Sequence, residues 1–343
     1  MAGEPKKVLV LSPVPEEVTR ALLKARVTDD EIRGIRLVSY GGSSQDELRQ
    51  AVSDADVIIG DYTNNIALDA GVMRSAKRCT FIQQPSTGFQ HIDVDEAARQ
   101  GISVANAAGA NTAAVAEHAI MLILACLKKL PLAAEKTRRC EWAQDEMSLY
   151  GVFEFSGKIL GIIGMGRIGR EVASRARPFG PVMTYHDVNR LTPQEEERLG
   201  LAYRDLDDLV RESDIVTIHV PLTSQTSMMM DGQRLAMMKR SAVVINVSRG
   251  EIVDEHALAQ ALREGRIGGA GVDVFSEEPI CRENPLLDAP NTILTPHIAG
   301  VTNESRVRVI DVTIENVARV LRGQEPMNVV NGVIPGAPRR PAR

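Results

Sequence analysis

The sequence predicts an α/β protein built from two doubly wound parallel sheets. Its 343 residues suggest about two domains of roughly 150 residues each. Short aliphatic runs alternate with helical stretches along most of the chain, and this alternation is typical of parallel sheets covered by helices on both faces. Apolar residues make up 44% of the chain but aromatic residues only 3%, so we expect aliphatic cores.

Five strands of a first sheet are expected before residue 106. They are the β-branched or aliphatic runs at 7–11, 35–39, 56–60, 79–83 and 102–105. A second series of six strands is expected at 158–163, 182–185, 214–220, 242–247, 270–274 and 291–294. Six strands with intervening helices match the doubly wound layout that binds dinucleotides.

A long helix is expected between the two series, at about 112–130. Its apolar run, 119–127, is far shorter than the roughly 20 residues of a membrane span, so we expect a buried helix of a soluble protein. An apolar run of this length covers every side of a helix, which favours burial against a second copy and therefore a homodimer. A helix fully buried within one chain is the alternative.

The C-terminal part of the chain is expected to form one more amphipathic helix at 301–321. Val307, Ile310, Ile314, Val317 and Leu321 recur there at helical spacing. This helix follows the last strand of the second series, so it could return to the first domain and make that domain discontinuous. The segment 335–343 has no apolar content to bury, and we expect it to be disordered.

Charge and cysteine content exclude several classes of function. The net charge of −5 disfavours nucleic-acid binding, which needs a basic surface. The four cysteines lie far apart without Cys-x-x-Cys spacing, which argues against a disulfide scaffold and a zinc site, so no metal is expected. The N-terminal segment lacks the apolar stretch of a signal peptide. We therefore expect a cytoplasmic protein without membrane or nucleic-acid partners.

The most informative local motif consists of three glycines that follow the expected strand at 158–163 and open a helix. Gly164 permits a tight turn, Gly166 allows the backbone to approach a pyrophosphate, and Gly169 allows close packing of helix on strand. The N–H groups at the start of this helix would face the phosphates. This context distinguishes the motif from a chance glycine pattern.

An acidic residue at the expected distance favours NAD as the cofactor. Asp187 follows the next strand, 187 − 164 = 23 residues beyond the first glycine, close to the roughly 20 typical of a ribose-binding acid. Its carboxylate would accept hydrogen bonds from the adenosine ribose and repel a 2′-phosphate. Arg190 lies nearby and could attract such a phosphate, and Asp187 could also be a solvated turn residue.

Three polar residues follow three different strands of the second series. Arg249 offers a planar fork for a substrate carboxylate, His297 can transfer a proton near neutral pH, and Glu278 can hold the imidazole. The carboxyl ends of parallel strands line one crevice, so these side chains should meet there and support carbonyl reduction. Each also has a structural alternative: a surface ion pair for Arg249, an exposed carboxylate for Glu278, and a backbone contact for His297.

Five motifs in order resemble those of D-isomer-specific 2-hydroxyacid dehydrogenases. They occupy residues 160–169, 219–223, 246–254, 271–279 and 295–300, and the similarity extends from the first strand to about Val333. The resemblance implies NAD-dependent interconversion of a 2-oxoacid and a D-2-hydroxyacid, with Arg249, Glu278 and His297 as the catalytic set. It also implies dimerisation through the long helix.

The resemblance further implies which residues bind the cofactor and the substrate. The substrate set is Thr87, Gly88, Arg249 and His297, with Thr87 and Gly88 supplying backbone N–H groups. Gln90 stands in that loop where an acidic residue is common, so the identity of the substrate stays open. Asp273 is implied to contact the nicotinamide amide. The cofactor set is Gly164, Gly166, Arg167, Ile168, Gly169, Asp187, Val220, Pro221, Val247, Ser248, Arg249, Asp273, His297 and Gly300.

These inferences give a domain assignment and leave alternatives open. We expect a flavodoxin-like substrate domain at 1–105 with 299–334, and a Rossmann domain that binds NAD at 106–298. A dinucleotide-responsive corepressor-like binding protein would keep the same fold and polar residues. Formate and phosphite dehydrogenases are similar too, but they usually place glutamine at the Glu278 position and lysine at the Thr87 position, respectively.

Overall fold

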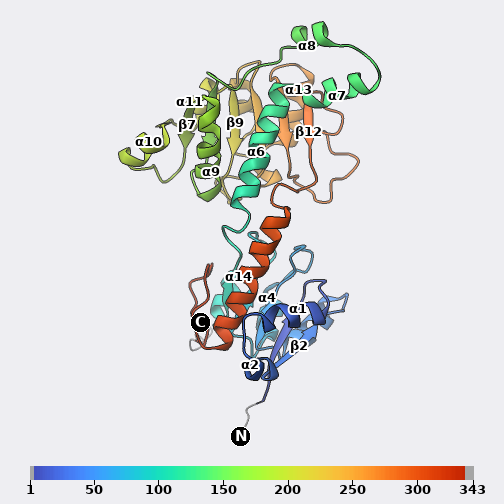
Figure 1. Ribbon diagram of the computed structural model, residues 1–343, viewed down its shortest axis with the longest axis vertical. Helices are drawn as coiled ribbons and strands as arrows, with labels where there is room; N and C mark the ends of the chain where they lie inside the picture. The colour runs from blue at the N-terminus through green and yellow to red at the C-terminus, as the bar shows by residue number, and fades with distance from the viewer. Residues whose placement is uncertain (1–3, 337–343) are drawn as a thin grey trace. The chain divides into compact units, whose positions relative to one another are not determined.

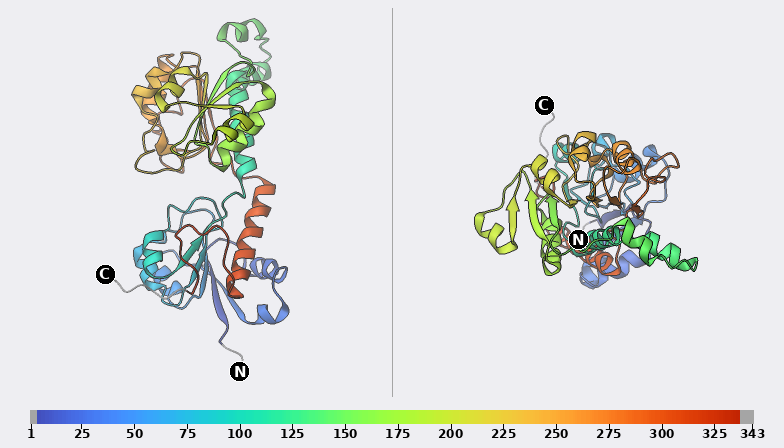
Figure 2. Two further views of the ribbon diagram at one scale, coloured as in Figure 1. Left: turned by 90° about the vertical axis from the view of Figure 1, so that its left-hand side faces the viewer. Right: turned by 90° about the horizontal axis from the view of Figure 1, so that it is seen from above.

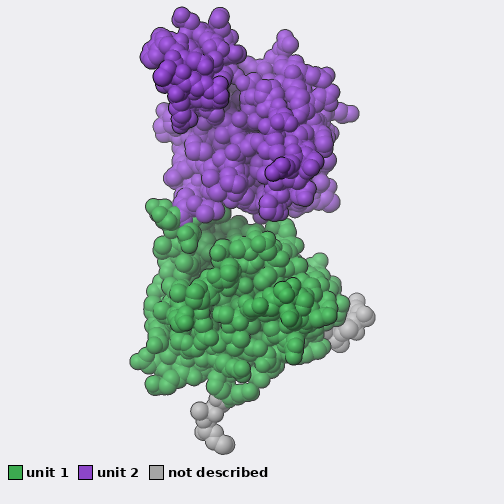
Figure 3. Space-filling view, turned by 90° about the vertical axis from the view of Figure 1, so that its right-hand side faces the viewer, with its two compact units in different colours: residues 1–111, 303–343 green, residues 112–302 purple. Residues whose placement is uncertain are grey.

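The computed structural model describes residues 4–336 and divides into two compact units. The first unit comprises Met1–Asn111 with Asn303–Arg343, and the second comprises Thr112–Thr302 (Figure 3). Of the segment expected to be disordered, Pro335 and Gly336 form a turn, and residues 337–343 lie outside the described residues.

The first unit contains a five-stranded parallel sheet with the order β2-β1-β3-β4-β5. This is the flavodoxin-like strand order, as expected. The three residues of β3, β4 and β5 are all buried, as in a sheet covered on both faces. The strands are β1 Lys6–Val10, β2 Ile35–Ser39, β3 Val57–Ile59, β4 Phe81–Gln83 and β5 Ser103–Ala105.

Within residues 4–336, six helices complete the first unit. Two of them begin with a reciprocal capping box, in which Thr28 pairs with Glu31 and Ser44 pairs with Glu47. The helices are α1 Glu16–Lys24, α2 Asp29–Arg33, α3 Gln45–Val52, α4 Ala70–Ser75, α5 Val94–Arg99 and α14 Asn303–Leu321.

Helix α14 returns to the first sheet from the far end of the chain (Figure 2). Its C-terminal half buries Ile314 and Val317 in the cluster that contains Phe81. The Asn316 amide donates to the side chain of Gln83 in β4 at 2.7 Å and to the carbonyl of Met327 at 2.9 Å. The N-terminal half differs from the expected apolar face, because Val307 is 59% exposed.

The second unit contains a seven-stranded parallel sheet with the order β12-β11-β10-β9-β6-β7-β8. From β6 outward, this is the dinucleotide-binding order with one added edge strand. The expectation of six strands was wrong, because β8 has only three residues after a helix-ending glycine and carries no periodic signal. The strands are β6 Ile159–Ile163, β7 Val182–His186, β8 Leu201–Tyr203, β9 Ile215–Ile218, β10 Val243–Asn246, β11 Gly269–Val272 and β12 Thr292–Leu294.

The long helix α6 is shorter and more deeply buried than expected. It ends at Leu127 rather than near 130, because Lys129 adopts a left-handed conformation with φ 47° and starts a new helix. Leu122 and Ile123 are fully buried in the core of the same unit, and Met121 is the exposed exception at 46%. The premise that one subunit could not bury this apolar run was therefore wrong.

The remaining helices of the second unit cover its sheet or extend from it. Those described are α6 Thr112–Leu127, α7 Leu130–Arg138, α8 Gln144–Tyr150, α9 Arg167–Ala176, α10 Pro193–Leu199, α11 Leu206–Glu212, α12 Gly232–Met237 and α13 Glu255–Arg263, with short 3-10 turns at Arg177–Phe179 and Gly250–Ile252. Helices α7 and α8 project from the body of this unit (Figures 1 and 2), and neither contains a buried residue. Across residues 4–336, we find no helix with both the length and the apolar character to cross a membrane.

Candidate active site

The three expected catalytic side chains lie at the carboxyl ends of neighbouring strands in the second unit. Arg249 follows β10, Glu278 follows β11 and His297 follows β12, and these strands are adjacent in the sheet. Parallel strands deliver their carboxyl ends to one edge, which explains why residues far apart in sequence meet.

The histidine and the glutamate form a direct pair. Nδ1 of His297 lies 2.6 Å from Oε2 of Glu278, and Oε1 of Glu278 accepts the backbone N–H of Phe275 at 2.9 Å. Burial raises the pKa of Glu278, but the hydrogen bonds from His297 and Phe275 and the charge of Arg249 outweigh it, so the net shift is downward. The Glu278 carboxylate is therefore ionised at neutral pH and can accept a hydrogen bond from Nδ1 of His297.

The backbone at His297 is held in an uncommon conformation. Its φ of 53° is left-handed, a region that non-glycine residues seldom adopt. Its N–H lies 2.8 Å from the carbonyl of Asp273 and 3.0 Å from that of Thr295. Strained residues persist where the surroundings over-determine them, and they cluster at functional sites.

Arg249 is half-buried at the same edge. Burial lowers its pKa, while the nearby charges of Glu278 and Glu251 oppose that shift, and the guanidinium remains cationic at physiological pH. Its Nη1 donates to the carbonyl of Ser248 at 2.6 Å. The residue after Arg249 must be glycine, because a Cβ on Gly250 would lie 1.9 Å from the carbonyl carbon of Phe275.

Two buried polar residues hold these loops through hydrogen bonds. Neither residue was among the site residues expected from the sequence. Asn246 donates to the carbonyl of Arg249 at 2.9 Å and accepts the N–H of Ser248 at 3.1 Å. Glu255 accepts the N–H of Ser276 at 2.7 Å and the amide of Asn284 at 2.8 Å. A polar residue ending an apolar strand was the available signal for Asn246, whereas no local pattern marks Glu255.

The glycine loop has the features that a dinucleotide pyrophosphate requires. Gly164 has φ 96°, and a Cβ there would approach the His219 backbone to 2.8 Å. A Cβ on Gly169 would lie 2.0 Å from the carbonyl oxygen of Gly164, so helix and strand pack closely. Gly166 faces open space, and the N-terminus of α9 has no side-chain cap. The loop thus fits the phosphates of NAD.

Asp187 lies beside the glycine loop. Its Oδ2 accepts the N–H of Met165 at 2.6 Å, and Oδ1 accepts the N–H of Asn189 at 2.8 Å. Arg190, which could have attracted a 2′-phosphate, pairs with Glu196 at 2.9 Å and lies over the ring of Tyr203. The Asp187 carboxylate therefore lies next to the glycine loop, and Arg190 is engaged by Glu196.

Two further expected cofactor residues, Val220 and Asp273, follow β9 and β11, respectively. Val220 packs at 2.8 Å from the position of a Cβ on Gly164. Asp273 is fully buried, and its carboxylate accepts the hydroxyl of Thr295 at 2.6 Å and the N–H groups of Ile298 and Ala299 at 2.9 and 2.8 Å. Its described contacts hold the loop that follows His297, and a contact with nicotinamide stays a prediction.

The expected substrate loop belongs to the first unit, where it follows β4. Thr87 Oγ1 donates to Asn111 at 3.0 Å, and the Thr87 carbonyl accepts the amide of Asn106 at 2.7 Å. Ser86 Oγ donates to the carbonyl of Gly88 at 2.7 Å. Within residues 4–336, the backbone N–H groups of Thr87 and Gly88 donate to no protein acceptor and are available to a carboxylate.

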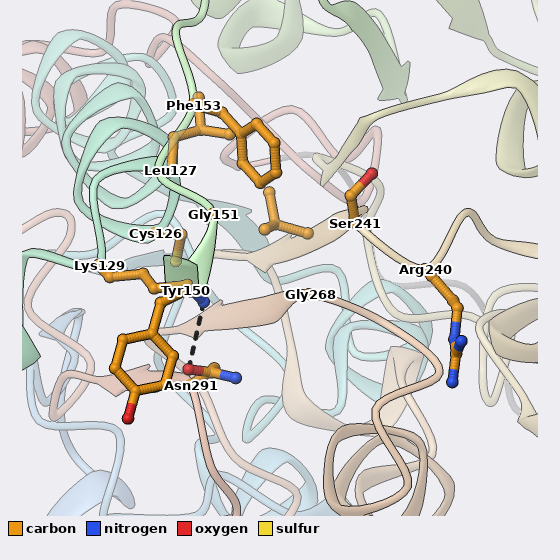
Figure 4. A pocket seen from close by; sticks show the side chains of 11 residues that line it. Cys126, Leu127, Lys129, Tyr150, Gly151, Phe153, Arg240, Ser241, Gly268 and Asn291 are labelled. Atoms are coloured by element: carbon orange, nitrogen blue, oxygen red, sulfur yellow. Dashed lines mark hydrogen bonds between the residues drawn. The ribbon is translucent and has the colours of Figure 1, made fainter. Parts of the chain in front are cut away.

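A separate cavity of about 310 Å³ lies at the opposite edge of the second sheet (Figure 4). It is lined by residues at the end of α6 and at the starts of strands, among them Cys126, Lys129, Val243 and Asn291. Lys129 Nζ donates to Asn291 across it at 3.3 Å. In parallel sheets ligands bind at the carboxyl ends, so this cavity is distinct from the crevice described above.

The fold and the polar set define an oxidoreductase that uses a dinucleotide. The family model for the NAD binding domain of D-isomer specific 2-hydroxyacid dehydrogenases matches residues 120–299, more than half of the chain. The chain belongs to this family, as its motifs predicted. Its reaction class is NAD-dependent interconversion of a 2-oxoacid and a 2-hydroxyacid, and a corepressor-like binding protein is not favoured.

Individual relatives support the same assignment. A glyoxylate reductase of Korarchaeum cryptofilum is 40% identical over 82% of this chain and 84% of its own length. A D-3-phosphoglycerate dehydrogenase of Methanocaldococcus jannaschii is 36% identical, but the chain covers only 59% of it. The apo structure of D-mandelate dehydrogenase from Rhodotorula graminis is 25% identical, has a TM-score of 0.87, and is matched over 97% of this chain and all of that one.

Proposed function

We propose that the protein reduces a small 2-oxoacid to the D-2-hydroxyacid with NADH. The observation that carries this proposal is the 2.6 Å pair of His297 and Glu278 beside the half-buried cation of Arg249. A relative described as a glyoxylate reductase is matched over most of its length, which favours a substrate with a small side chain.

Arg249 binds the substrate carboxylate in this proposal. The guanidinium fork suits a planar carboxylate, and its partial burial strengthens the attraction. Bound NADH supplies the hydride to the carbonyl carbon.

His297 donates the proton to the carbonyl oxygen. Its Nδ1 is engaged by Glu278, so the transferred proton leaves from Nε2. The cation of Arg249 and the imidazolium stabilise the negative charge that develops on the oxygen, a preorganised effect worth about 3 kcal/mol per donor in closed sites.

Steady-state oxidation of NADH with a panel of 2-oxoacids tests the proposal. Glyoxylate, pyruvate, hydroxypyruvate, an aryl 2-oxoacid and a phosphorylated 2-oxoacid cover the open choices of side chain. We expect the highest kcat/KM for a small unphosphorylated member. No turnover with any member, alongside measurable NADH binding, would contradict the proposed reaction.

We also propose that the protein is a homodimer, on a different observation from the one that the sequence offered. Helices α7 and α8 bury no residue, and the segment between and within them exposes Trp142 by 86% and Leu149 by 89%. Large apolar side chains grouped on a projecting segment are typical of an interface. A second copy of the chain would cover them.

A cytoplasmic location completes the proposal. The four cysteines, all within the described residues, form no disulfide, and Cys140 is exposed, which suits a reducing compartment. Fractionation of cells that produce the protein, with a cytoplasmic enzyme as a marker, tests this location.

A further inference from the structure

A buried hydrogen-bonded chain connects α6 to the loop that carries His297. Nε2 of His118 lies 3.1 Å from Oγ1 of Thr295, and this hydroxyl lies 2.6 Å from Oδ1 of Asp273. The side chain of His118 is 11% exposed and that of Asp273 is fully buried. All three residues belong to the second unit.

Packing explains how His118 reaches this position. A Cβ on Gly271 in β11 would lie 3.0 Å from Cβ of Leu122, so the missing side chain lets α6 approach the sheet closely. His118 is one helical turn before Leu122 on the same face and is thereby brought to Thr295. Burying an imidazole in an apolar helix is costly unless its N–H is satisfied, and Thr295 satisfies it.

The direction of the hydrogen bonds follows from the number of protons. Asp273 can only accept, so the single proton of the Thr295 hydroxyl points to it, and the hydroxyl oxygen accepts from Nε2 of His118. Burial lowers the pKa of His118, while the charge of Asp273, 3.6 Å away, opposes that shift. The ring is therefore neutral at neutral pH, with its proton on Nε2.

The hydrogen-bonded chain from His118 ends on the backbone of the loop that carries His297. The Asp273 carboxylate accepts the N–H groups of Ile298 and Ala299, the two residues after His297. The Asp273 carbonyl accepts the N–H of His297, which has left-handed φ. Asp273 thus fixes the strained turn on both sides of the imidazole, and His118 and Thr295 fix Asp273.

We propose that His118 is a positioning residue for proton transfer: it donates to Thr295 and so orients Asp273 and the loop that aims His297 at Glu278. The inference rests on the proposed role of His297 as the acid. A leucine at this position would fill the same space in α6 without supplying the N–H.

Kinetics of His118→Leu, His118→Gln and Thr295→Val test the proposal. We expect His118→Leu and Thr295→Val each to lower kcat for 2-oxoacid reduction about tenfold, the rate equivalent of one net hydrogen bond. The double variant should be no slower than either single one, because both break the same chain. His118→Gln, which keeps a donor, should retain most of the activity.

The pH profile separates positioning from loss of stability. A displaced His297 loses the favourable charge of Glu278, so the alkaline limb of the reduction rate should move toward acid in His118→Leu and Thr295→Val. Ile123→Ala, a buried substitution in the same helix, is the control and should lower Tm while leaving this limb in place. If His118→Leu fails to fold, Thr295→Val alone carries the test.

Two results would overturn the inference. One is that Thr295→Val and His118→Leu have the same kcat as Ile123→Ala and the same alkaline limb of the reduction rate. The other is additive losses in the double variant. Failure of the proposed function looks different, because the unaltered protein would then show no reduction of 2-oxoacids, or His297→Ala would stay active.

Discussion

At the scale of single residues, the pair of His297 and Glu278 determines how the rate depends on pH. The lowered pKa of Glu278 keeps its carboxylate charged at neutral pH, so this carboxylate can hold the ring of His297 through Nδ1. Reduction of a 2-oxoacid consumes a proton, so its rate should fall as pH rises, and the rate of oxidation should rise.

Substitutions at this pair give the first prediction. His297→Ala should lower kcat by roughly 10²-fold or more, the usual scale for a general acid, with a much smaller change in NADH affinity. Glu278→Gln removes the negative charge, so the alkaline limb of reduction should move toward acid. Stopped-flow and steady-state rates measured from about pH 5 to about pH 10 report both effects. An unchanged profile in both variants would contradict the assignment.

Asp187 gives a second prediction, about the choice of cofactor. Its carboxylate lies beside the glycine loop while Arg190 is paired with Glu196, so a 2′-phosphate would meet net repulsion. NADH should be used at least tenfold more efficiently than NADPH, a difference of about 1.4 kcal/mol. Asp187→Ser should narrow that preference. Asp208→Ser, which removes an exposed carboxylate on α11, is the control and should not.

At the scale of elements, Glu255 links the start of α13 to the loop that carries Glu278. Glu255 is 8% exposed, and its carboxylate accepts hydrogen bonds from Ser276 and Asn284. Hydrogen bonds to a charged group contribute more than neutral ones, and removing the acceptor leaves buried donors without a partner. The loop therefore depends on a residue outside it.

Removing that carboxylate is the third prediction. Glu255→Ala should lower the free energy of unfolding by about 2 kcal/mol and reduce kcat, because the segment between β11 and Glu278 is released. Chemical denaturation and steady-state kinetics measure the two effects. Glu283→Ala, an exposed carboxylate of the same loop, should change neither. A stable and fully active Glu255→Ala variant would show that the loop keeps its conformation without the Glu255 carboxylate.

At the scale of the whole molecule, the projecting helices α7 and α8 predict the state of association. Sedimentation velocity at micromolar concentration should show a species of twice 37.3 kDa. Charges introduced by Trp142→Glu with Leu149→Glu should weaken association, since both side chains are almost fully exposed. Val18→Glu, at a half-exposed apolar position on α1, is the control. A single species of 37.3 kDa for the unaltered chain would contradict the proposed dimer.

The sequence by itself determined the reaction class and the two-sheet fold. The three glycines, Asp187 and the polar residues after strands are local patterns, and parallel topology alone brings Arg249, Glu278 and His297 to one edge. The structure confirms that juxtaposition for the pair of His297 and Glu278, whose atoms meet at 2.6 Å. Such features are predictable because each depends on a short stretch of chain.

Only the tertiary structure decided that β8 forms, where α6 is buried and which distant residues hold the loops of the site. β8 forms because it pairs with β7, since three residues carry too little pattern of their own. The apolar run of α6 is buried within its own unit because Gly271 and the sheet accept it on several sides, and the sequence could not distinguish this from an interface. The hydrogen bonds of Glu255 with Ser276 and of His118 with Thr295 join residues that lie 21 and 177 positions apart in the sequence. Contacts of this kind depend on where packing places distant segments, and periodicity carries no information about that.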